Sequence, residues 1–345
     1  MVMALSPHVV VWESTKACDF ACRHCRADAI PHRLPGELST EEVRGMIDQL
    51  AGMDVKLFVI SGGDALKRDD IFELIEYGSS RLRTALSPSG SRIDSTVAES
   101  IRKAGAAVVS ISVDGPQPVH DEFRGVNGAF SIATKAVASL HGAGVPVQIN
   151  STLSVYNINV LSELKETVLA LEPAYWDLFM IVPTGRATAA MSLTQEQANT
   201  AMKVAAAWRA EGIQVRMTCA PYLIRIMSDR GAKPQKPDEK GRKSLNGARG
   251  CMAGNGYSFI SYNGTVYPCG FLPLRAGSIR ESSFAEIYGG TLFSGLRNSS
   301  LLGGKCGICN FRTVCGGCRA RAYANSRDWM AEDPLCDYTV PRTGA

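Results

Sequence analysis

The stretch Cys18-Asp-Phe-Ala-Cys22-Arg-His-Cys25 follows an apolar run, 8–14, that is typical of a buried strand. Its cysteines are separated by three and by two residues, so three thiolates can bind three irons on one face of a cubane cluster. The fourth iron then stays open for a ligand, whereas a four-cysteine site is closed and suits electron transfer. The alternative is a zinc knuckle with His24 or His32 as fourth ligand, although zinc sites favour paired Cys-x-x-Cys units.

Beyond this motif, apolar runs alternate with amphipathic stretches of helical length. After 8–14, we expect strands at 55–60, 82–87, 107–113, 146–153, 177–182 and 213–218. We expect helices at 71–77, 95–104, 130–141, 161–170 and 195–211, and a first one that Ser39 or Thr40 can cap. This alternation predicts an α/β fold in which helices cover a parallel sheet, as in a partial (β/α)6-type barrel.

A change in composition divides the chain. Segment 228–250 is rich in Asp, Arg, Gly, Lys and Pro and nearly free of apolar residues, which is typical of a basic, flexible linker. A lid over an anionic substrate is the other interpretation of the linker. The segment 256–269 after it reads as a hairpin around Asn263-Gly264. We therefore predict a barrel core over 1–227, the linker, and a small cysteine-rich domain over 251–345.

Composition and charge exclude some classes of protein. The 345 residues are 45% hydrophobic and 20% charged, and the net charge is only +4, which is too small and too dispersed for a dedicated nucleic-acid binder. No apolar run approaches the ~20 residues of a membrane span, and no signal peptide is evident. We expect a cytoplasmic protein, in which clustered thiols bind metal more often than they form disulfides.

The remaining cysteines of the eleven gather near the end of the chain. Seven lie in the last hundred residues, and a zinc site would be a fair interpretation of this group if it stood alone. They are Cys251, Cys269, Cys306, Cys309, Cys315, Cys318 and Cys336. Cys219 stands apart from both groups. It fits a buried thiol as well as it fits a chemically active residue.

The first motif, placed after the first strand, resembles that of the radical S-adenosylmethionine (SAM) superfamily. The resemblance implies that Cys18, Cys22 and Cys25 hold a [4Fe–4S] cluster whose open iron chelates the amino and carboxylate groups of SAM. It further implies an enzyme that cleaves SAM reductively to a 5′-deoxyadenosyl radical and takes hydrogen from its substrate. Such an oxidoreductase or lyase works without oxygen and receives electrons from a reductant such as flavodoxin or ferredoxin.

The same resemblance implies a set of SAM contacts. Ser61-Gly62-Gly63-Asp64 follows the second strand, where the family has a Gly-Gly-Glu loop that holds the methionine amino group. Glycines let the backbone approach a ligand, and an acid pairs with an ammonium group. Ser112, Asp114 and Asn150 end the next strands and could face the ribose or carboxylate of SAM; alternatively, they are polar strand ends bonded to backbone. His24 stands where the family usually has an aromatic residue near the adenine, which implies a role in the shape of the site and not in acid–base chemistry.

The cysteine-rich tail resembles the SPASM extension, which carries auxiliary [4Fe–4S] clusters. The order of cysteines matches that pattern, except that two residues instead of three separate Cys315 from Cys318. The resemblance implies that one cluster is closed by four cysteines, namely Cys306, Cys309, Cys315 and Cys336. It implies a second cluster on three cysteines with one site open, namely Cys251, Cys269 and Cys318.

Within this group the chain looks most similar to the heme-pathway decarboxylases. Resembling stretches include Thr218-Cys-Ala-Pro221, Pro268-Cys-Gly-Phe-Leu272 and Gly277-Ser-Ile-Arg280. The resemblance implies oxidative decarboxylation of tetrapyrrole propionates, with an auxiliary cluster as electron acceptor. Arg186 is a candidate clamp for a substrate carboxylate, or a plain surface arginine. The alternative function is a maturase that modifies a ribosomally synthesised peptide.

Overall fold

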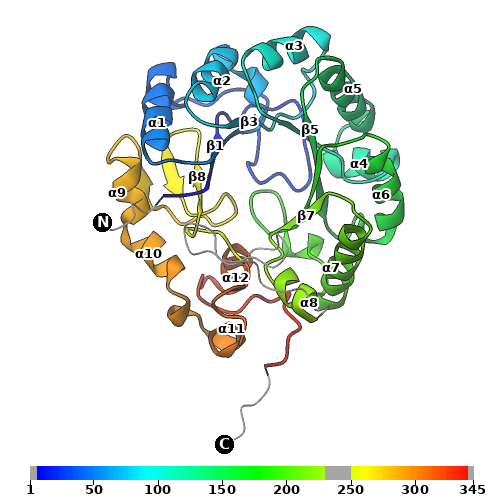
Figure 1. Ribbon diagram of the computed structural model, residues 1–345, viewed down its shortest axis with the longest axis vertical. Coiled ribbons are helices and arrows are strands. Elements are labelled where there is room, and N and C mark those ends of the chain that lie inside the picture. The colour runs from blue at the N-terminus through cyan, green and yellow to red at the C-terminus, as the bar shows by residue number, and fades with distance from the viewer. Residues whose placement is uncertain (1–5, 230–249, 341–345) are drawn as a thin grey trace, which may run out of the picture.

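The structure, a computed structural model, describes residues 6–229 and 250–340. The strands of these residues form one sheet in the order β10-β9-β8-β1-β2-β3-β4-β5-β6-β7, which curves around the centre of the molecule (Figure 1). The strands are β1 (Val9–Glu13), β2 (Leu57–Ser61), β3 (Thr84–Leu86), β4 (Val109–Ser112), β5 (Val147–Leu153), β6 (Tyr175–Met180), β7 (Val215–Thr218), β8 (Tyr257–Ile260), β9 (Thr265–Tyr267) and β10 (Gly277–Ser278).

Helices follow the strands and surround the sheet, as the alternating pattern predicts (Figure 1). They are α1 (Thr40–Gly52), α2 (Ile71–Ser79), α3 (Ser95–Lys103), α4 (Gln117–Arg124), α5 (Ala129–Gly142), α6 (Leu161–Leu169), α7 (Gln195–Ala210), α8 (Leu223–Asp229), α9 (Phe284–Gly289), α10 (Thr291–Arg297), α11 (Gly304–Ile308) and α12 (Arg319–Ser326). Short 3-10 turns are η1 (Ala65–Lys67), η2 (Ile158–Val160), η3 (Ala189–Met191) and η4 (Ser299–Leu301). The predicted α/β barrel fold is confirmed.

The seven predicted strands are present as β1 to β7, and all neighbours among them pair in parallel. β6 is shifted by two residues at both ends, and it begins at Tyr175, which pairs with Gln148 of β5. Ser39 caps α1 and forms a capping box with Glu42, as the sequence indicates. No helix in the described part of the chain is both long enough and apolar enough to cross a membrane.

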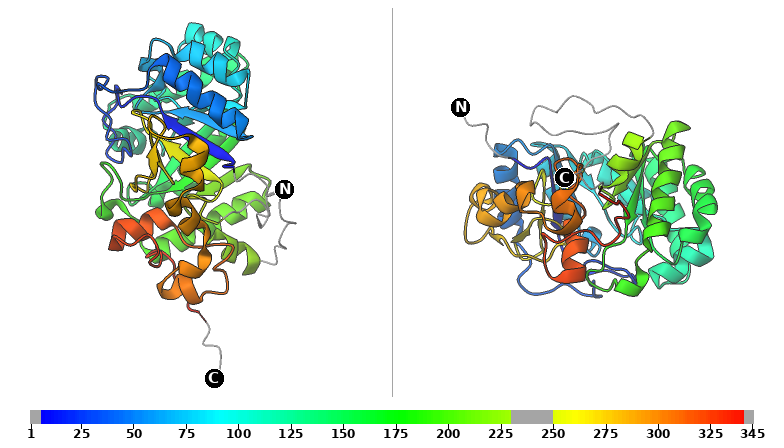
Figure 2. Two further views of the ribbon diagram at one scale, coloured as in Figure 1. Left: turned by 90° about the vertical axis from the view of Figure 1, so that its left-hand side faces the viewer. Right: turned by 90° about the horizontal axis from the view of Figure 1, so that it is seen from below.

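The predicted hairpin is also present, but it belongs to the barrel sheet. β8 and β9 pair antiparallel, while β8 pairs in parallel with β1 on its other side. The hairpin therefore extends the barrel sheet beyond β1, although in sequence it lies after residue 251, where the separate cysteine-rich domain was predicted to begin. That boundary remains a prediction, and most of the predicted linker, 228–250, lies outside the described residues. Helices α11 and α12 lie at the end of the molecule where the C-terminal segment emerges (Figure 2).

The two faces of the sheet differ in burial, and this positions the site. On β6, Trp176, Leu178 and Met180 are buried, and Trp176 stacks on Trp208 of α7 at 5.1 Å. These side chains form the core between sheet and helices. The alternate residues Tyr175, Asp177 and Phe179 point to the inner face and stay partly exposed. On β6 the inner face is therefore less buried than the face that packs on the helices.

Candidate iron–sulfur and SAM site

The three cysteines of the first motif lie in the loop that leaves the carboxyl end of β1. The backbone N–H of Phe20 donates to Sγ of Cys18, and that of Ala29 donates to Sγ of Cys25, each at 3.4 Å. Donors that point at sulfur stabilise a thiolate, which is the form that ligates iron. The chemistry of this loop therefore fits an iron–sulfur cluster.

Cys22 has a charged donor in addition. Nη1 of Arg124 lies 3.8 Å from its Sγ, while Nη2 and Nε of Arg124 donate to Asp114 at 2.6 and 2.7 Å. Asp114 is fully buried and also accepts the backbone N–H of Thr152 at 2.7 Å. Burial alone would raise the pKa of Asp114, but Arg124 holds it below its ordinary value. Asp114 thus orients Arg124 toward the loop, and a direct contact with SAM remains a prediction.

Arg186, the candidate carboxylate clamp, also supports the cysteine loop, and its Nη2 is buried without a hydrogen-bond partner among the described residues. Its Nε donates to the carbonyl of Cys22 at 2.9 Å and its Nη1 donates to that of Ala29 at 2.7 Å. Gly185 before it has φ +65°, and a Cβ there would collide with the carbonyls of Cys25 and Arg26. The turn after β6 therefore packs directly on the loop, and two of the three guanidinium nitrogens of Arg186 are already used.

We expect Arg186→Ala to reduce the occupancy of the first cluster. Hydrogen bonds from charged donors contribute about 1.5–3 kcal/mol each, and the variant removes two of them from the loop. The electron paramagnetic resonance signal that responds to SAM should weaken by several-fold, while auxiliary iron stays constant. Arg102→Ala, which breaks an exposed pair with Glu99 on α3, is the control. Equal SAM-responsive signals in both variants would contradict this role.

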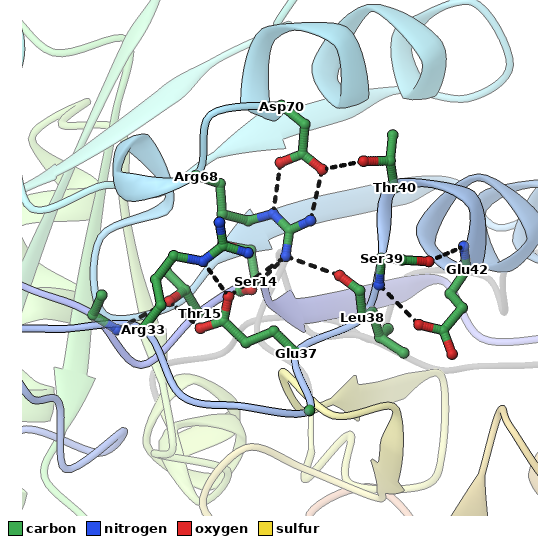
Figure 3. Close-up of polar contacts among 12 residues, drawn as sticks. Ser14, Thr15, Arg33, Glu37, Leu38, Ser39, Thr40, Glu42, Arg68 and Asp70 are labelled. Carbon is green, nitrogen blue, oxygen red and sulfur yellow. Dashed lines mark hydrogen bonds and ion pairs between the residues drawn. The ribbon is translucent and has the colours of Figure 1, made fainter.

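A buried arginine holds the far end of the loop (Figure 3). Arg68 donates to both oxygens of Asp70, at 2.9 and 2.7 Å, and to the carbonyls of Ser14 and Leu38, at 3.3 and 3.1 Å. Next to Arg68, the carboxylate of Glu37 accepts hydrogen bonds from the Thr15 hydroxyl at 2.5 Å and from Nε of Arg33 at 2.6 Å. This network joins the end of β1 to the segment before α1, so the loop between them is anchored on both sides.

The predicted glycine turn lies against the entrance of the same loop. A Cβ on Gly62 would come within 2.7 Å of the Thr15 carbonyl, and one on Gly63 within 2.5 Å of the Ala17 carbonyl. Both glycines are thus required by close backbone packing. The backbone N–H of Asp64 donates to the Ala17 carbonyl at 2.7 Å.

The carboxylate of Asp64 is buried and satisfied by protein donors. It accepts the backbone N–H of Leu66 at 3.1 Å, which caps η1, and the hydroxyls of Ser89 and Ser91 at 2.6 and 3.3 Å. Each of these donors is neutral, so the charge of Asp64 is not compensated by them. Its contact with a SAM ammonium group remains a prediction.

Ser112 and Asn150 belong to a row of polar residues across the inner face of the sheet. Register pairs Ser112 with Asn150, Asn150 with Asp177, and Asp177 with Arg216. Burial raises the pKa of Asp177 to about 6, although Thr218 donates to it at 2.9 Å. Asp177 and Arg216 are not among the site residues predicted from the sequence, although polar residues within predicted strands were the available signal.

His24, within the cysteine loop, is partly buried and packs against α4. Its ring stacks on Phe123 at 3.8 Å, and Phe123 contacts Tyr156 at 5.3 Å. Burial lowers the pKa of His24 to about 3, so the ring is neutral at physiological pH. This agrees with a role in shape.

The four cysteines assigned to the closed auxiliary cluster line one small cavity, namely Cys306, Cys309, Cys315 and Cys336. Three of their sulfurs accept hydrogen bonds, from the backbone N–H of Phe311 and of Gly317 and from Arg319. A shared cavity with donors on the sulfurs fits a four-thiolate cluster. No group of three or more His, Cys, Asp or Glu among the residues described here is arranged to hold a single metal ion.

The other three cysteines also lie together, and Cys219 joins them. Cys269 and Cys219 pack in one apolar group with Cys318, and the thiols of Cys219 and Cys318 lie close enough to interact. Cys251 is close enough to Cys269 and Cys318 for their charges to interact. The backbone N–H of Phe271 donates to Sγ of Cys269 at 3.4 Å. All the cysteines are free thiols.

A parallel barrel with a three-thiol loop after its first strand and a thiol-rich tail defines an iron–sulfur barrel protein. Residues 12–171 match the model of the radical SAM superfamily, and residues 251–319 match an iron–sulfur cluster-binding domain of the SPASM type. The chain belongs to the radical SAM superfamily. It is an enzyme that binds SAM and iron–sulfur clusters, cleaves SAM to a 5′-deoxyadenosyl radical and abstracts hydrogen from its substrate.

Two relatives and one solved structure illustrate the similarity. The AdoMet-dependent heme synthase of Oleidesulfovibrio alaskensis is 40% identical, over 96% of this chain and 87% of its own. The AdoMet-dependent heme synthase of Methanosarcina barkeri is 36% identical, over 98% of both chains. Streptococcus suis SuiB bound to S-adenosylmethionine has the same fold, with a TM-score of 0.77 and 16% identity over 96% of this chain and 78% of its own. The predicted family and its heme-pathway group are confirmed.

Proposed function

We propose that this enzyme decarboxylates propionate side chains of a tetrapyrrole oxidatively, in heme biosynthesis. The observation that carries the proposal is 40% identity to an AdoMet-dependent heme synthase across nearly the whole chain. In this reaction a propionate loses one hydrogen atom, carbon dioxide and one electron, and a vinyl group remains. An auxiliary cluster accepts the electron, and a flavodoxin or ferredoxin in the cytoplasm supplies the electron for SAM cleavage.

The ligand assignments form part of this proposal. Cys18, Cys22 and Cys25 hold the cluster that binds SAM, because their loop leaves the carboxyl end of β1 and is lined with donors to sulfur. One auxiliary cluster is held by Cys306, Cys309, Cys315 and Cys336. The other is held by Cys251, Cys269 and Cys318.

The chain's own residues position the reactants. The Gly62-Gly63-Asp64 turn holds the amino group of SAM, and Ser112 and Asn150 contact its ribose or carboxylate. Arg216 lies in the same inner-face row, is exposed, and stacks on Tyr175 at 4.4 Å. A guanidinium group there can pair with a propionate bidentately, a role that Arg186 is poorly placed to fill.

The maturase alternative has weaker support. The mycofactocin maturase MftC of Mycobacterium tuberculosis is 28% identical to this chain, and SuiB, which has been solved with a precursor peptide, shares only the fold. The heme synthases are 36% and 40% identical. No feature of the inner-face row specifically favours a peptide.

We expect anaerobic turnover with dithionite and SAM to convert a tetrapyrrole with propionate side chains into a vinyl product. The product should be lighter by carbon dioxide and two hydrogens per side chain, which mass spectrometry detects. Arg216→Ala should raise the KM for the tetrapyrrole, while cleavage of SAM without substrate stays unchanged. Product formed from a precursor peptide, with none from tetrapyrroles, would instead establish the maturase.

We expect Asp64→Asn to weaken SAM binding by about ten- to a hundredfold. The charge-assisted bond to the ammonium group contributes roughly 1.5–3 kcal/mol, and 1.4 kcal/mol is about a factor of ten. Asparagine also caps helices well, so the cap on Leu66 is retained, while the hydroxyls of Ser89 and Ser91 face an amide nitrogen in place of the second oxygen. Equilibrium binding to reconstituted protein measures the effect.

Asp64→Glu, which restores the acid that is usual in the family, is the matched variant. It should bind SAM more tightly than the Asn variant, provided that the packed turn accommodates the longer side chain. Neither variant should alter the ultraviolet–visible spectrum of the first cluster, because Asp64 is not assigned as an iron ligand. Unchanged affinity in Asp64→Asn would remove Asp64 from the site.

A further inference from the structure

Cys219 occupies a backbone position that suits a glycine. It directly follows β7, at the carboxyl end of that strand, with φ +59°. A residue with a Cβ rarely adopts this left-handed conformation, and such strain concentrates at functional sites. The strained turn places the Cys219 thiol beside Cys318, at the N-terminus of α12.

One buried ion pair positions both of these cysteines. Arg321 donates to the two oxygens of Asp333 at 2.8 and 2.9 Å, and both side chains are almost completely buried. The same guanidinium group donates to the Cys219 carbonyl at 2.9 Å. Asp333 in turn accepts the backbone N–H of Cys318 at 2.8 Å. The end of β7 and the start of α12 are thereby held together at the two thiols.

The surroundings of Cys219 are those of the three-cysteine auxiliary site. Cys269 and Cys318 pack in the same group as Cys219, together with Val182 and Leu272. Cys251 lies within reach of both Cys269 and Cys318. Four thiols from four separate segments thus converge on one place between the barrel and the tail.

We infer that Cys219 is the fourth ligand of the auxiliary cluster held by Cys251, Cys269 and Cys318. This inference rests on the proposed auxiliary site. With it, all eleven cysteines of the chain have a role, three at the SAM site and four in each auxiliary cluster. A cluster closed by four thiolates has no open iron, so it transfers electrons and does not bind the substrate. The substrate is then held by protein side chains alone.

The inference is tested in full-length protein that also carries Cys18, Cys22 and Cys25→Ala, so that the open iron of the first cluster does not interfere. Cys219→Gly removes the thiol and also relieves the left-handed backbone. If Cys219 were only a buried thiol and not an iron ligand, the glycine variant would therefore keep all its iron. Arg327→Gly is the matched control, because Arg327 has φ +60°, is exposed and ends α12.

We expect Cys219→Gly either to lose one cluster's worth of iron or to keep a cluster with an exchangeable site. In the second case the reduced protein should show hyperfine coupling to added ¹³C-cyanide, which the parent and Arg327→Gly should not show. Cys219→Ser, which keeps a possible oxygen ligand, should shift the g-values of one auxiliary signal and serves as readout if the glycine variant does not fold.

Two results would overturn these assignments, and they are distinguishable. Iron content, spectra and cyanide response identical to those of the parent in both Cys219 variants would make Cys219 a buried thiol. Cys269→Ala should lose iron in either case. If Cys269→Ala also keeps all its iron, the proposed auxiliary site itself is wrong.

Discussion

Simultaneous replacement of Cys18, Cys22 and Cys25 by alanine is expected to abolish formation of 5′-deoxyadenosine. These thiols occupy one loop after β1, and their sulfurs accept hydrogen bonds from Phe20, Ala29 and Arg124. The other cysteines lie in two further groups, so the variant should keep its auxiliary iron. Chromatography of the SAM cleavage products, together with iron analysis of the reconstituted protein, measures both quantities.

The reverse variant is the control. Replacement of Cys306, Cys309 and Cys336 by alanine should remove the iron of one auxiliary cluster and leave SAM cleavage in place, since these residues line a separate cavity. The reconstituted parent should hold roughly eight to twelve irons, which corresponds to two or three cubanes. Undiminished cleavage by the Cys18/Cys22/Cys25 variant would refute the assignment of the SAM site. Stoichiometric zinc with one cluster's worth of iron would restore a zinc site in the tail.

Asp333→Ala is expected to lower the free energy of unfolding by about 3–5 kcal/mol. It leaves the guanidinium group of Arg321 buried without its counter-ion, which is strongly destabilising, and it removes the acceptor of the Cys318 N–H. A loss of this size is a large fraction of the stability of a typical domain. Urea denaturation of the reconstituted protein under anaerobic conditions measures it.

Glu281→Ala is the matched control for this prediction. It removes an acid from a pair with Arg275 at 2.6 Å in which both side chains are more than half exposed. Exposed pairs contribute about 0–1 kcal/mol, so the denaturation midpoint should hardly change. Equal destabilisation by both variants would mean that the Arg321–Asp333 pair does not hold the tail to the barrel.

Much of the fold could be predicted from the sequence because the signals are local. Apolar runs mark β1 to β7, Ser39 and Glu42 mark the start of α1, and Asn263-Gly264 marks the hairpin. These patterns depend on neighbours a few residues apart. The spacing of Cys18, Cys22 and Cys25 is equally local, so the class of enzyme was recognisable without the structure.

The tertiary structure decided which distant segments meet. The sequence analysis set Cys219 apart, yet the path of the chain brings it to Cys318, and the buried Arg321–Asp333 pair holds both. Arg186 was predicted as a candidate substrate clamp, and only the structure shows that the turn at Gly185 places its Nε and Nη1 on carbonyls of the cysteine loop. The hairpin joined the barrel because β8 pairs with β1, a partner that no local pattern specifies. Spacing and periodicity determine elements and motifs, whereas contacts between distant segments depend on the packing of the whole chain.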